Sequence, residues 1–572
     1  MQMFRAVQVE RHFGKREILE AYFTLAPYGG NVEGIEAAAQ RWCGKTAREL
    51  TLREAVALSV IPQKPTARTP RIGNDTSAAQ ARLLARLAAA DGLDAAYALQ
   101  PFAVPRFAPH LARRLGTATT LDAAQQAIIE ESIAEFLERW RPQGLRNAAA
   151  ILVHAPTREV RAYVGSAGFF DERIHGQVDG VTARRSPGSA LKPFIYALAL
   201  DQGLVHPRTL LDDTPRRFGG YNPENSDRGF LGPIAAAESL RRSRNVPAVE
   251  LASRLRTPGL DGFLRSAGVA FEKPRGEYGL ALALGGGEVT LEELARLYAM
   301  LASDGVSRPL AFAATGLIDG TPRLSAEARA LTLAALRGEH GFAVKTGTSH
   351  GFRDAWACGV IGDWVLCMWV GHFDGTPMPG LFARDTAAPL LVQTALRLGL
   401  RDAAKPRPPG IVEVELCADS GGLACAHCPN HTRGPFIAGV SPISECDVHR
   451  VIDVVVRECW PAHRLEQFRR AGLPRAESPT THGGAAPRIV SPQAALTYVV
   501  RPGQLEKNAI PLEAEASAGT KQVHWFEGHR YLGASAPAQP LMWKPMPGKW
   551  SLQAIDDAGR TAQVAVRVTA ER

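Results

Sequence analysis

The chain has 572 residues, of which 45% are apolar and 7% aromatic, and it carries a formal net charge of +9. This composition is typical of a globular protein with a sizeable core, and the length predicts three or four domains. The charge favours polyanionic partners, but the basic residues are scattered and no nucleic-acid-binding motif is present, so we expect no nucleic-acid partner. No run of about 18 apolar residues and no signal peptide occurs, which predicts no membrane anchor within this sequence.

Residues 1–95 mix apolar and charged positions at helical spacing, which predicts a helical region. Several motifs lie at 15–22, 29–38, 44–45, 51–55 and 62–65. They resemble the last two motifs of the family 51 peptidoglycan glycosyltransferases, although Thr24 departs from the asparagine usual there. The resemblance implies that this region is the C-terminal part of such a domain, with Lys15 and Glu20 in supporting positions.

Transfer of a sugar to a growing glycan requires a carboxylate that deprotonates the attacking hydroxyl and cationic groups that bind the departing diphosphate. By the resemblance, the catalytic glutamate and the basic third motif of the family lie upstream of this sequence. We therefore predict that residues 1–95 are a glycosyltransferase remnant that is inactive and acts as a helical packing platform. We also expect that the sequence starts at an internal methionine of a longer protein.

The segment 96–145 is predicted to connect this region to the next domain. Its first part, 96–118, contains three prolines and reads as an irregular connector, and 119–145 predicts a helix.

Residues 146–400 predict an α+β domain. Apolar runs over 148–155 and 158–165 predict one hairpin and the run over 358–373 another, with helices between them. We expect one antiparallel sheet with helices packed on it.

Ser189 and Lys192 stand three residues apart, so on a helix they share one face. A serine hydroxyl becomes a nucleophile when a base lies within hydrogen-bond reach, and Lys192 is the expected base. Pro187 and Gly188 suit the start of that helix. Lys192 must lose its proton, which requires burial or nearby positive charge, and Lys345 is the expected source of that charge.

Ser243 and Asn245 lie two residues apart, which in a short turn directs both side chains toward one cleft. We expect Ser243 to relay a proton between Lys192 and the leaving amine, and Asn245 to hold the substrate amide. The two expected donors of the oxyanion hole are the backbone N–H groups of Ser189 and Thr348.

The motif from Lys345 to Thr348 predicts an edge strand that borders the cleft. Gly347 is expected to let the substrate backbone approach closely. Thr346 and Thr348 offer hydroxyl groups for the terminal carboxylate of the substrate.

The order of these three motifs, with spacings of about 50 and about 100 residues, carries a family resemblance. Further landmarks lie at 119–126, 221–225, 236–240, 282–290 and 351–356. Together they resemble the class A (bifunctional) penicillin-binding proteins, most closely those of the 1C type, over essentially the whole chain. The resemblance implies a β-lactamase-like serine DD-transpeptidase that forms an acyl-enzyme on Ser189 and cross-links D-Ala-D-Ala stem peptides.

The resemblance also implies the partners and the location. We expect peptidoglycan stem peptides, glycan strands and β-lactams as ligands, and cell-wall synthesis proteins as partners. Transpeptidation needs no metal or organic cofactor, although some glycosyltransferase domains of the family use a divalent metal. The family is anchored in the bacterial inner membrane with its domains on the periplasmic side, and this sequence contains no such anchor.

Two rival functions remain open. A DD-carboxypeptidase or a β-lactamase-like hydrolase shares the first three motifs, and a class A β-lactamase needs a carboxylate that activates water, for which Glu224 and Glu238 are candidates. A non-catalytic cell-wall scaffold is the other rival, although it has no need of Ser189, Lys192 and Lys345.

The eight cysteines form two groups. Cys43, Cys358 and Cys367 stand in apolar surroundings and are predicted to be buried small hydrophobes. The other five crowd the predicted linker region 405–480 at Cys417, Cys425, Cys428, Cys446 and Cys459. An oxidising periplasm favours disulfides there. The spacings of 425–428 and 446–449 are also compatible with a Cys3His zinc ribbon, and free thiols are the third alternative.

Residues 487–572 predict a C-terminal β-sandwich that resembles the terminal domain of the 1C type. Candidate strands lie at 510–516, 523–526, 550–554 and 562–568. Before it, 478–486 is rich in Pro, Thr and Gly and is expected to be flexible. Trp525, Trp543 and Trp550 are expected to be core aromatics. The predicted fold class is thus multidomain α+β.

Overall fold

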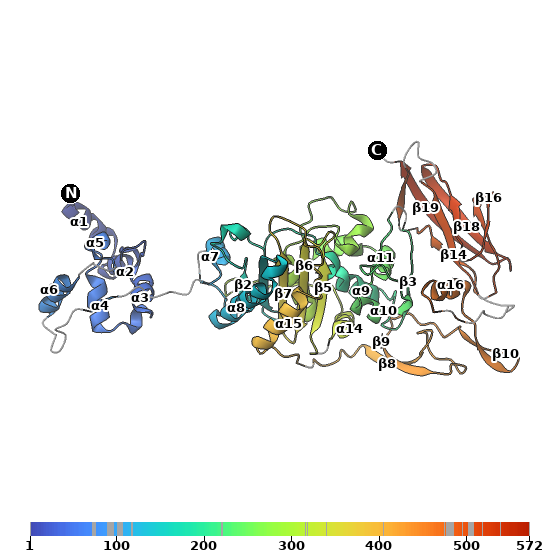
Figure 1. Cartoon of the computed structure of the whole chain (residues 1–572), viewed down its shortest axis with the longest axis horizontal. Coiled ribbons are helices and arrows are strands. Elements are labelled where there is room, and N and C mark those ends of the chain that lie inside the picture. The colour runs from blue at the N-terminus through green and yellow to red at the C-terminus, as the bar shows by residue number, and fades with distance from the viewer. Residues whose placement is uncertain are drawn as a thin grey trace. The chain divides into compact units, whose positions relative to one another are not determined.

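The computed structural model describes residues 2–70, 76–87, 97–99, 107–115, 118–218, 221–314, 316, 318–338, 340–403, 405–473, 475, 485–494, 496–500, 508–517, 519–537 and 539–570. These residues belong to two compact units, Met1–Phe107 and Ala108–Arg572 (Figure 1). Each unit is described by itself.

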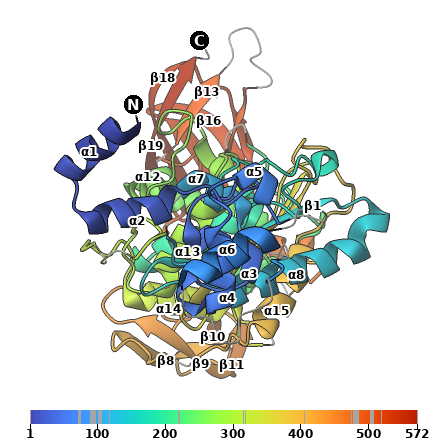
Figure 2. The same cartoon turned by 90° about the vertical axis from the view of Figure 1, so that its left-hand side faces the viewer.

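The first unit is helical, as predicted. Its elements are α1 (Gln2–His12), α2 (Lys15–Leu25), α3 (Ile35–Cys43), η1 (Ala47–Glu49), α4 (Leu52–Ser59), α5 (Pro65–Arg68) and α6 (Ser77–Leu87). Helix α4 contacts both α3 and α6 (Figure 2). Thr51 caps α4 by accepting a hydrogen bond from Glu54 N, and Trp42, Leu58 and Ile61 are buried in a small core. Within the predicted helical region 1–95, residues 71–75 and 88–95 lie outside the described residues.

The predicted connector over 96–145 crosses the boundary between the two units, which lies between Phe107 and Ala108. Residues 96, 100–106 and 116–117 of the predicted connector lie outside the described part of the chain, and Pro109–Leu115 forms helix α7. The predicted leading helix is α8 (Ala123–Trp140), which Asp122 caps through Gln125 N.

A five-stranded antiparallel sheet forms the centre of the second unit, in the order β2-β1-β7-β6-β5. The strands are β1 (Asn147–His154), β2 (Glu159–Val164), β5 (Ala343–Thr348), β6 (Asp354–Ile361) and β7 (Trp364–Gly371). Both predicted hairpins, β1/β2 and β6/β7, are confirmed, and β5 is an edge strand as expected. The single antiparallel sheet is therefore correct.

Helices cover both faces of this sheet (Figure 1). Helices α8 and α15 (Ala387–Arg397) pack on one face, and α9 (Lys192–Asp201) and α13 (Leu291–Ala302) lie in the core on the other. Because both faces are covered, every residue of β6 is buried, and the strands read as continuous apolar runs.

The remaining elements of this domain are η2 (Arg141–Gln143), η3 (Glu172–Ile174), η4 (Gly188–Leu191), β3 (Leu210–Asp213), β4 (Gly232–Ala235), α10 (Ala236–Arg241), α11 (Asn245–Arg254), α12 (Gly259–Ser266), η5 (Gly279–Leu284) and α14 (Ala326–Leu336).

Two small hairpins and a helix follow the sheet domain. They are β8 (Ile411–Cys417), β9 (His431–Ile437), β10 (His449–Ile452), β11 (Val455–Glu458) and α16 (Ala462–Arg470). Most of the expected flexible stretch over 478–486 lies outside the described residues.

The C-terminal strands form two sheets, in the orders β12-β14-β17 and β13-β19-β18-β15-β16. They are β12 (Arg488–Ser491), β13 (Thr497–Val500), β14 (Ile510–Glu515), β15 (Val523–Glu527), β16 (Arg530–Ser535), β17 (Leu541–Trp543), β18 (Gly548–Asp556) and β19 (Thr561–Ala570). The predicted strands correspond to β14, β15, β18 and β19, whereas β12, β13, β16 and β17 were not anticipated. Trp525 and Trp543 are buried core aromatics, and Trp550 packs against the same core while half-buried.

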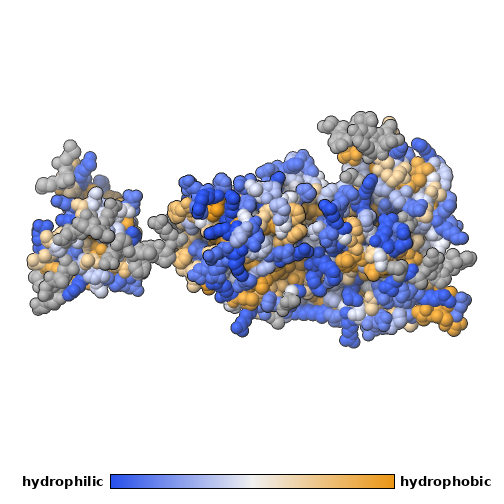
Figure 3. Space-filling view, viewed as in Figure 1, coloured by the Kyte–Doolittle hydropathy of each residue, from blue (hydrophilic) through white to orange (hydrophobic). Residues whose placement is uncertain are grey.

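The surface mixes hydrophilic and apolar residues (Figure 3). An apolar patch marks the tip of the β10–β11 hairpin, where Val454 is 95% exposed and Val451, Val455 and Val456 are also exposed. None of the described helices is both long and apolar enough to cross a bilayer.

Candidate active site

Ser189 lies in η4, a single 3-10 turn that runs directly into α9. Sequence analysis predicted an α-helix at this point, but regular α-helix begins only at Lys192. A 3-10 turn has about three residues per turn, so residues three apart are eclipsed and Ser189 still shares a face with Lys192.

Glycine packing holds this turn against β5. Gly188 has φ 53°, and a Cβ on it would lie 2.9 Å from Thr348 N and clash with Thr348 O. A Cβ on Gly347 would clash with Pro187 O and lie 3.0 Å from Ala190 N. This buried glycine therefore lets the turn that carries Ser189 approach β5 closely, and the approach of a substrate backbone at Gly347 stays a prediction.

Lys192 is fully buried beneath the cleft. Its Nζ donates hydrogen bonds to Ser243 O at 2.6 Å, Arg244 O at 2.9 Å and Asn245 Oδ1 at 2.6 Å. Burial and then the positive charges of Lys345 and Arg244 hold the pKa of Lys192 well below its usual value, and the negative charge of Asp213 acts in the opposite direction. Among the described residues no hydrogen bond joins Lys192 Nζ to Ser189 Oγ.

Lys345 is 2% exposed and reaches the same turn from β5. Its Nζ donates to Ser243 Oγ at 2.7 Å and to Thr346 O at 2.7 Å. Burial lowers the pKa of Lys345 to about 7. The two lysines thus flank Ser243, and no carboxylate in the described part of the chain is a hydrogen-bond partner of either.

The turn from Ser243 to Asn245 is held by a network that the sequence did not reveal. Arg244 Nε donates to Asp213 Oδ2 at 2.7 Å, and Asp213 is fully buried. Asn225 Oδ1 accepts from Asn245 N at 2.7 Å, and its amide donates to Asp213 Oδ1 at 2.8 Å. Ser243 has φ 58°, a left-handed conformation that serine rarely adopts, so this network fixes a strained turn.

A signal for this network was present in the sequence. Asn225 ends the landmark at 221–225, and Arg244 is the middle residue of the second motif. This signal does not identify the network, because the partner Asp213 belongs to no motif.

A cleft of about 1070 Å³ opens over these groups. Predicted residues that line it are Ser189, Ser243, Asn245, Thr346 and Thr348. Thr348 Oγ1 accepts a hydrogen bond from Ala383 N at 3.1 Å, which leaves the hydroxyl proton of Thr348 available to a ligand. Lys192, Lys345 and Gly347 lie beneath the cleft lining.

The two carboxylates considered for water activation differ in position. Glu224 lines the cleft and is exposed. Glu238 is not a lining residue and pairs with Arg241 at 3.1 Å and Arg242 at 2.5 Å. Of the two, only Glu224 lies at the site.

The landmark at 351–356 leads into the central sheet and contacts the segment just before Ser189. Trp356 Nε1 donates to Ser186 O at 2.8 Å, close to the nucleophile turn. Asp354 accepts from Trp369 Nε1 at 3.0 Å and lies 3.4 Å from Arg185.

The glycosyltransferase residues of the first unit form no comparable site. Lys15 and Glu20 are both exposed on α2, and Glu20 Oε1 accepts from Arg16 Nε at 2.9 Å. The structure brings neither of them to a described cleft.

The cysteines correct a further expectation. All eight are free thiols, so the predicted disulfides of the cysteine-rich region are absent. Cys358 and Cys367 are buried as expected, whereas Cys43 is only half-buried. The sulfur atoms of Cys417, Cys428 and Cys446 converge on His449 instead of forming pairs, as described below.

Comparison with known proteins assigns the chain to a family. The model described as "Penicillin binding protein transpeptidase domain" matches residues 148–321, and "Transglycosylase" matches residues 1–88. "Penicillin-binding protein 1A, C-terminal domain" matches 407–451, and "Penicillin-Binding Protein C-terminus Family" matches 477–568. Penicillin-binding protein 1C of Escherichia coli (strain K12) is 38% identical over 453 residues, 73% of this chain. The chain belongs to the class A penicillin-binding proteins.

Other members of the class are more distant. Penicillin-binding protein 1A of Clostridium botulinum (strain Hall) is 22% identical over 551 residues, covering 78% of this chain and 66% of that protein. The crystal structure of penicillin-binding protein 1A from Haemophilus influenzae has a TM-score of 0.55 at 19% identity and covers 76% of this chain and 92% of that one, which confirms the multidomain fold. The chain spans 59% of the length of the E. coli relative.

The matched transpeptidase region does not include the whole candidate site. The transpeptidase match ends at residue 321, so the third motif lies beyond it. The structure nevertheless brings Lys345 to within 2.7 Å of Ser243.

Proposed function

We propose that this chain is a peptidoglycan DD-transpeptidase that forms an acyl-enzyme on Ser189 and is acylated there by penicillins. The single observation that carries the proposal is the meeting of three motifs at one cleft. Ser189 lines the cleft, Ser243 lies opposite within reach of Lys345, and Lys192 lies beneath both. D-Ala-D-Ala stem peptides are the proposed donors and a wall-peptide amine the acceptor.

Acylation requires that the proton of Ser189 Oγ leave as the bond to the substrate carbonyl forms. Lys192 is the proposed base because its burial lowers its pKa. Its hydrogen bonds to the Ser243–Asn245 turn hold it in position. In enzymes without substrate the hydrogen bond between base and nucleophile is often long, and it shortens when substrate binds. The backbone N–H groups of Ser189 and Thr348 are the proposed oxyanion hole, since Gly188 packs directly against Thr348.

The leaving amine must receive a proton. Ser243 Oγ is the proposed relay between Lys192 and this amine: it gives its own proton to the amine and regains one from Lys192, which took it from Ser189. Lys345 Nζ donates a hydrogen bond to Ser243 Oγ and stabilises the charge that develops there. Asn245 is the proposed holder of the substrate amide, and Thr346 and Thr348 of its carboxylate. These side chains supply the nucleophile, the base and the donors, so the proposed reaction uses no metal or organic cofactor.

Location and partners follow the family. We propose that the chain acts on the periplasmic side of the inner membrane, on stem peptides attached to glycan strands, together with other cell-wall synthesis proteins. The exposed positions of Lys15 and Glu20 support no catalytic role for these two residues.

Labelling with a fluorescent penicillin tests the proposal. The wild-type chain should give a covalent band that persists for hours, Ser189→Ala should give none, and the cleft-lining control Ser226→Ala should label like the wild type. A band that fades within minutes would instead support the hydrolase alternative, with Glu224 as the group that activates water. Absence of labelling in a folded wild-type chain would contradict the acyl-enzyme mechanism.

A further inference from the structure

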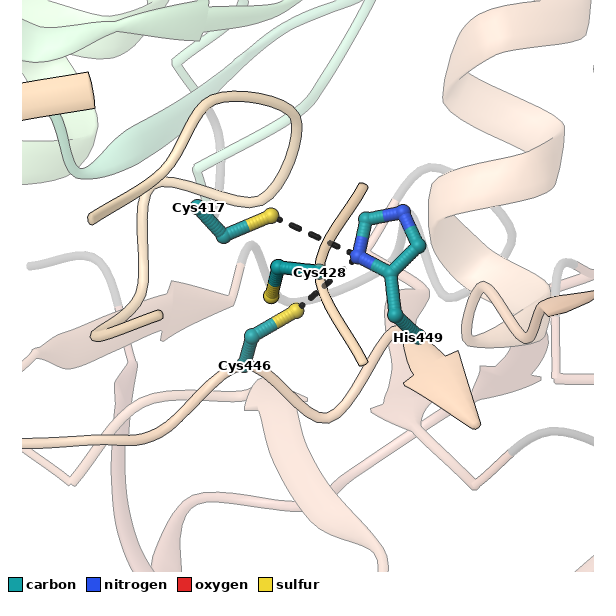
Figure 4. A group of neighbouring side chains, drawn as sticks. All are labelled: Cys417, Cys428, Cys446 and His449. Carbon is teal, nitrogen blue, oxygen red and sulfur yellow. Dashed lines mark hydrogen bonds between the residues drawn. The ribbon is translucent and has the colours of Figure 1, made fainter. Parts of the chain in front are cut away.

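We propose that Cys417, Cys428, Cys446 and His449 bind one zinc ion as a closed structural site. The four residues are buried, and one ligand atom from each lies within 4.8 Å of all the others. Figure 4 shows the four side chains pointing toward one another, with Cys417 and Cys428 on separate segments and Cys446 and His449 on a third.

The distances fit tetrahedral coordination. Zinc binds cysteine sulfur at about 2.3 Å and histidine nitrogen at about 2.0–2.1 Å, which in a tetrahedron places sulfur about 3.6 Å from nitrogen. His449 Nδ1 lies 3.4 Å from Cys417 Sγ and 3.4 Å from Cys446 Sγ. A disulfide joins two sulfurs at about 2.0 Å and leaves an imidazole unused, so this arrangement suits a metal better than a disulfide.

The surroundings also suit zinc thiolates. Backbone N–H groups of Ser420 and Cys425 donate to Cys417 Sγ and Cys428 Sγ, each at 3.4 Å. Such hydrogen bonds stabilise negative charge on sulfur, which is the form that binds metal.

The imidazole faces the kind of group that usually orients zinc-bound histidines. His449 Nε2 is buried and has no hydrogen bond to any described residue, and Asp419 Oδ2 lies 3.6 Å away. With Nδ1 on the metal, Nε2 carries the proton and faces this carboxylate, the usual arrangement for orienting a ligating histidine.

The donor set indicates both the metal and its role. Three thiolates and one imidazole favour zinc, and four protein ligands leave no open position for substrate. The three cysteines belong to a small core with Trp460 and Phe468, against which Leu210 of β3 packs. A core of this size gains stability from a metal, because the ligands link segments that are separate in the unfolded chain.

Two nearby cysteines lie outside this set, and one of them, Cys459, serves as the control. Cys425 is half-buried, and its Sγ lies 3.5 Å from Cys428 Sγ. Cys459 is buried, and its Sγ lies near Arg457 O at 3.9 Å. Sequence spacing favoured Cys425 as a ligand, but the fold brings Cys417, at the end of β8, to that position.

Metal analysis of the full chain tests the proposal. The chain purified from zinc-supplemented cells under reducing conditions should contain about one zinc per molecule, as measured by inductively coupled plasma mass spectrometry. Cys446→Ser and His449→Asn should lose it, while Cys459→Ser should keep it. Replacement by Co²⁺ should give the visible absorption of a tetrahedral thiolate site.

A second measurement covers variants that fail to fold. A zinc chelator added to the wild-type chain should release stoichiometric metal and lower the melting temperature, and added zinc should restore it. A folded wild-type chain that contains no zinc after this purification would overturn the proposal, as would full zinc content in Cys446→Ser. Penicillin labelling is a separate readout, so failure of the zinc proposal leaves the proposed function untouched.

Discussion

Arg244 and Asp213 form a buried ion pair, with Nε 2.7 Å from Oδ2, directly behind the turn that carries Ser243 and Asn245. Arg244 also pairs with Asp227 at 2.7 Å. The arginine therefore acts through its neighbours: it holds a turn whose serine has φ 58°. We regard it as a positioning residue of the class A site.

Arg244→Ala should destabilise the chain by about 3 kcal/mol or more, because it leaves the Asp213 carboxylate buried without its cation. Penicillin acylation should slow at least tenfold as the turn relaxes. Urea unfolding measures the loss of stability, and a time course of penicillin labelling measures the rate of acylation. Arg242→Ala is the matched control: its surface pair with Glu238 should contribute less than about 1 kcal/mol. Equal effects of the two substitutions would contradict the positioning role.

The low pKa of Lys345 predicts a pH dependence of stability. Its pKa is about 7 in the folded chain and about 10.4 when unfolded, so between these values the unfolded chain binds more protons and stability rises with pH. The penalty of burying the charged lysine is complete below pH 7 and is relieved as the pH rises toward 10.

The difference in unfolding free energy between wild type and Lys345→Met isolates this effect. It should shift in favour of the wild type by up to about 1.4 kcal/mol per pH unit between pH 7 and 10. The exposed Lys549→Met serves as control and should show no such slope. A flat difference for Lys345→Met would mean that the lysine keeps its ordinary pKa.

Gly347→Ala should displace the nucleophile turn, because its Cβ would clash with Pro187 O. We expect a loss of about 1–3 kcal/mol of stability, typical of overpacking, together with strongly reduced acylation. Gly316→Ala, where a Cβ meets open space, is the control. Unchanged labelling of Gly347→Ala would show that Ser189 tolerates movement of its turn.

Thr346→Val keeps the shape of the strand and removes a cleft hydroxyl. If this hydroxyl binds the substrate carboxylate, acylation by penicillin should fall about tenfold, as expected for a lost hydrogen bond to a charged group. Acylation by the methyl ester of the same penicillin should be low but equal in both proteins. A similar decrease for acid and ester would assign Thr346 another role.

Much of the sheet domain was predictable because its signals are local. The apolar runs that became β1, β2, β6 and β7 are continuous, and turn residues separate each pair. The placement of Ser189 and Lys192 on one face follows from spacing alone.

The parts that sequence reasoning missed depend on contacts between distant positions. Strand β13 pairs with β19 in parallel, and no local pattern indicates such a partner. Asp213 precedes Arg244 by 31 residues and belongs to no motif. In the cysteine-rich region, the pairing of near neighbours suggested Cys425, whereas the chain path brings Cys417 to the cluster.

The two buried lysines have a consequence for how the site responds to salt. Their hydrogen-bond partners are uncharged oxygens, and both side chains are at most 2% exposed. Mobile ions screen charges at the surface and hardly reach charges in the interior. Changes in ionic strength should therefore leave the protonation of Lys192 and Lys345 nearly constant, and should weaken the long-range attraction that a net charge of +9 exerts on any polyanion.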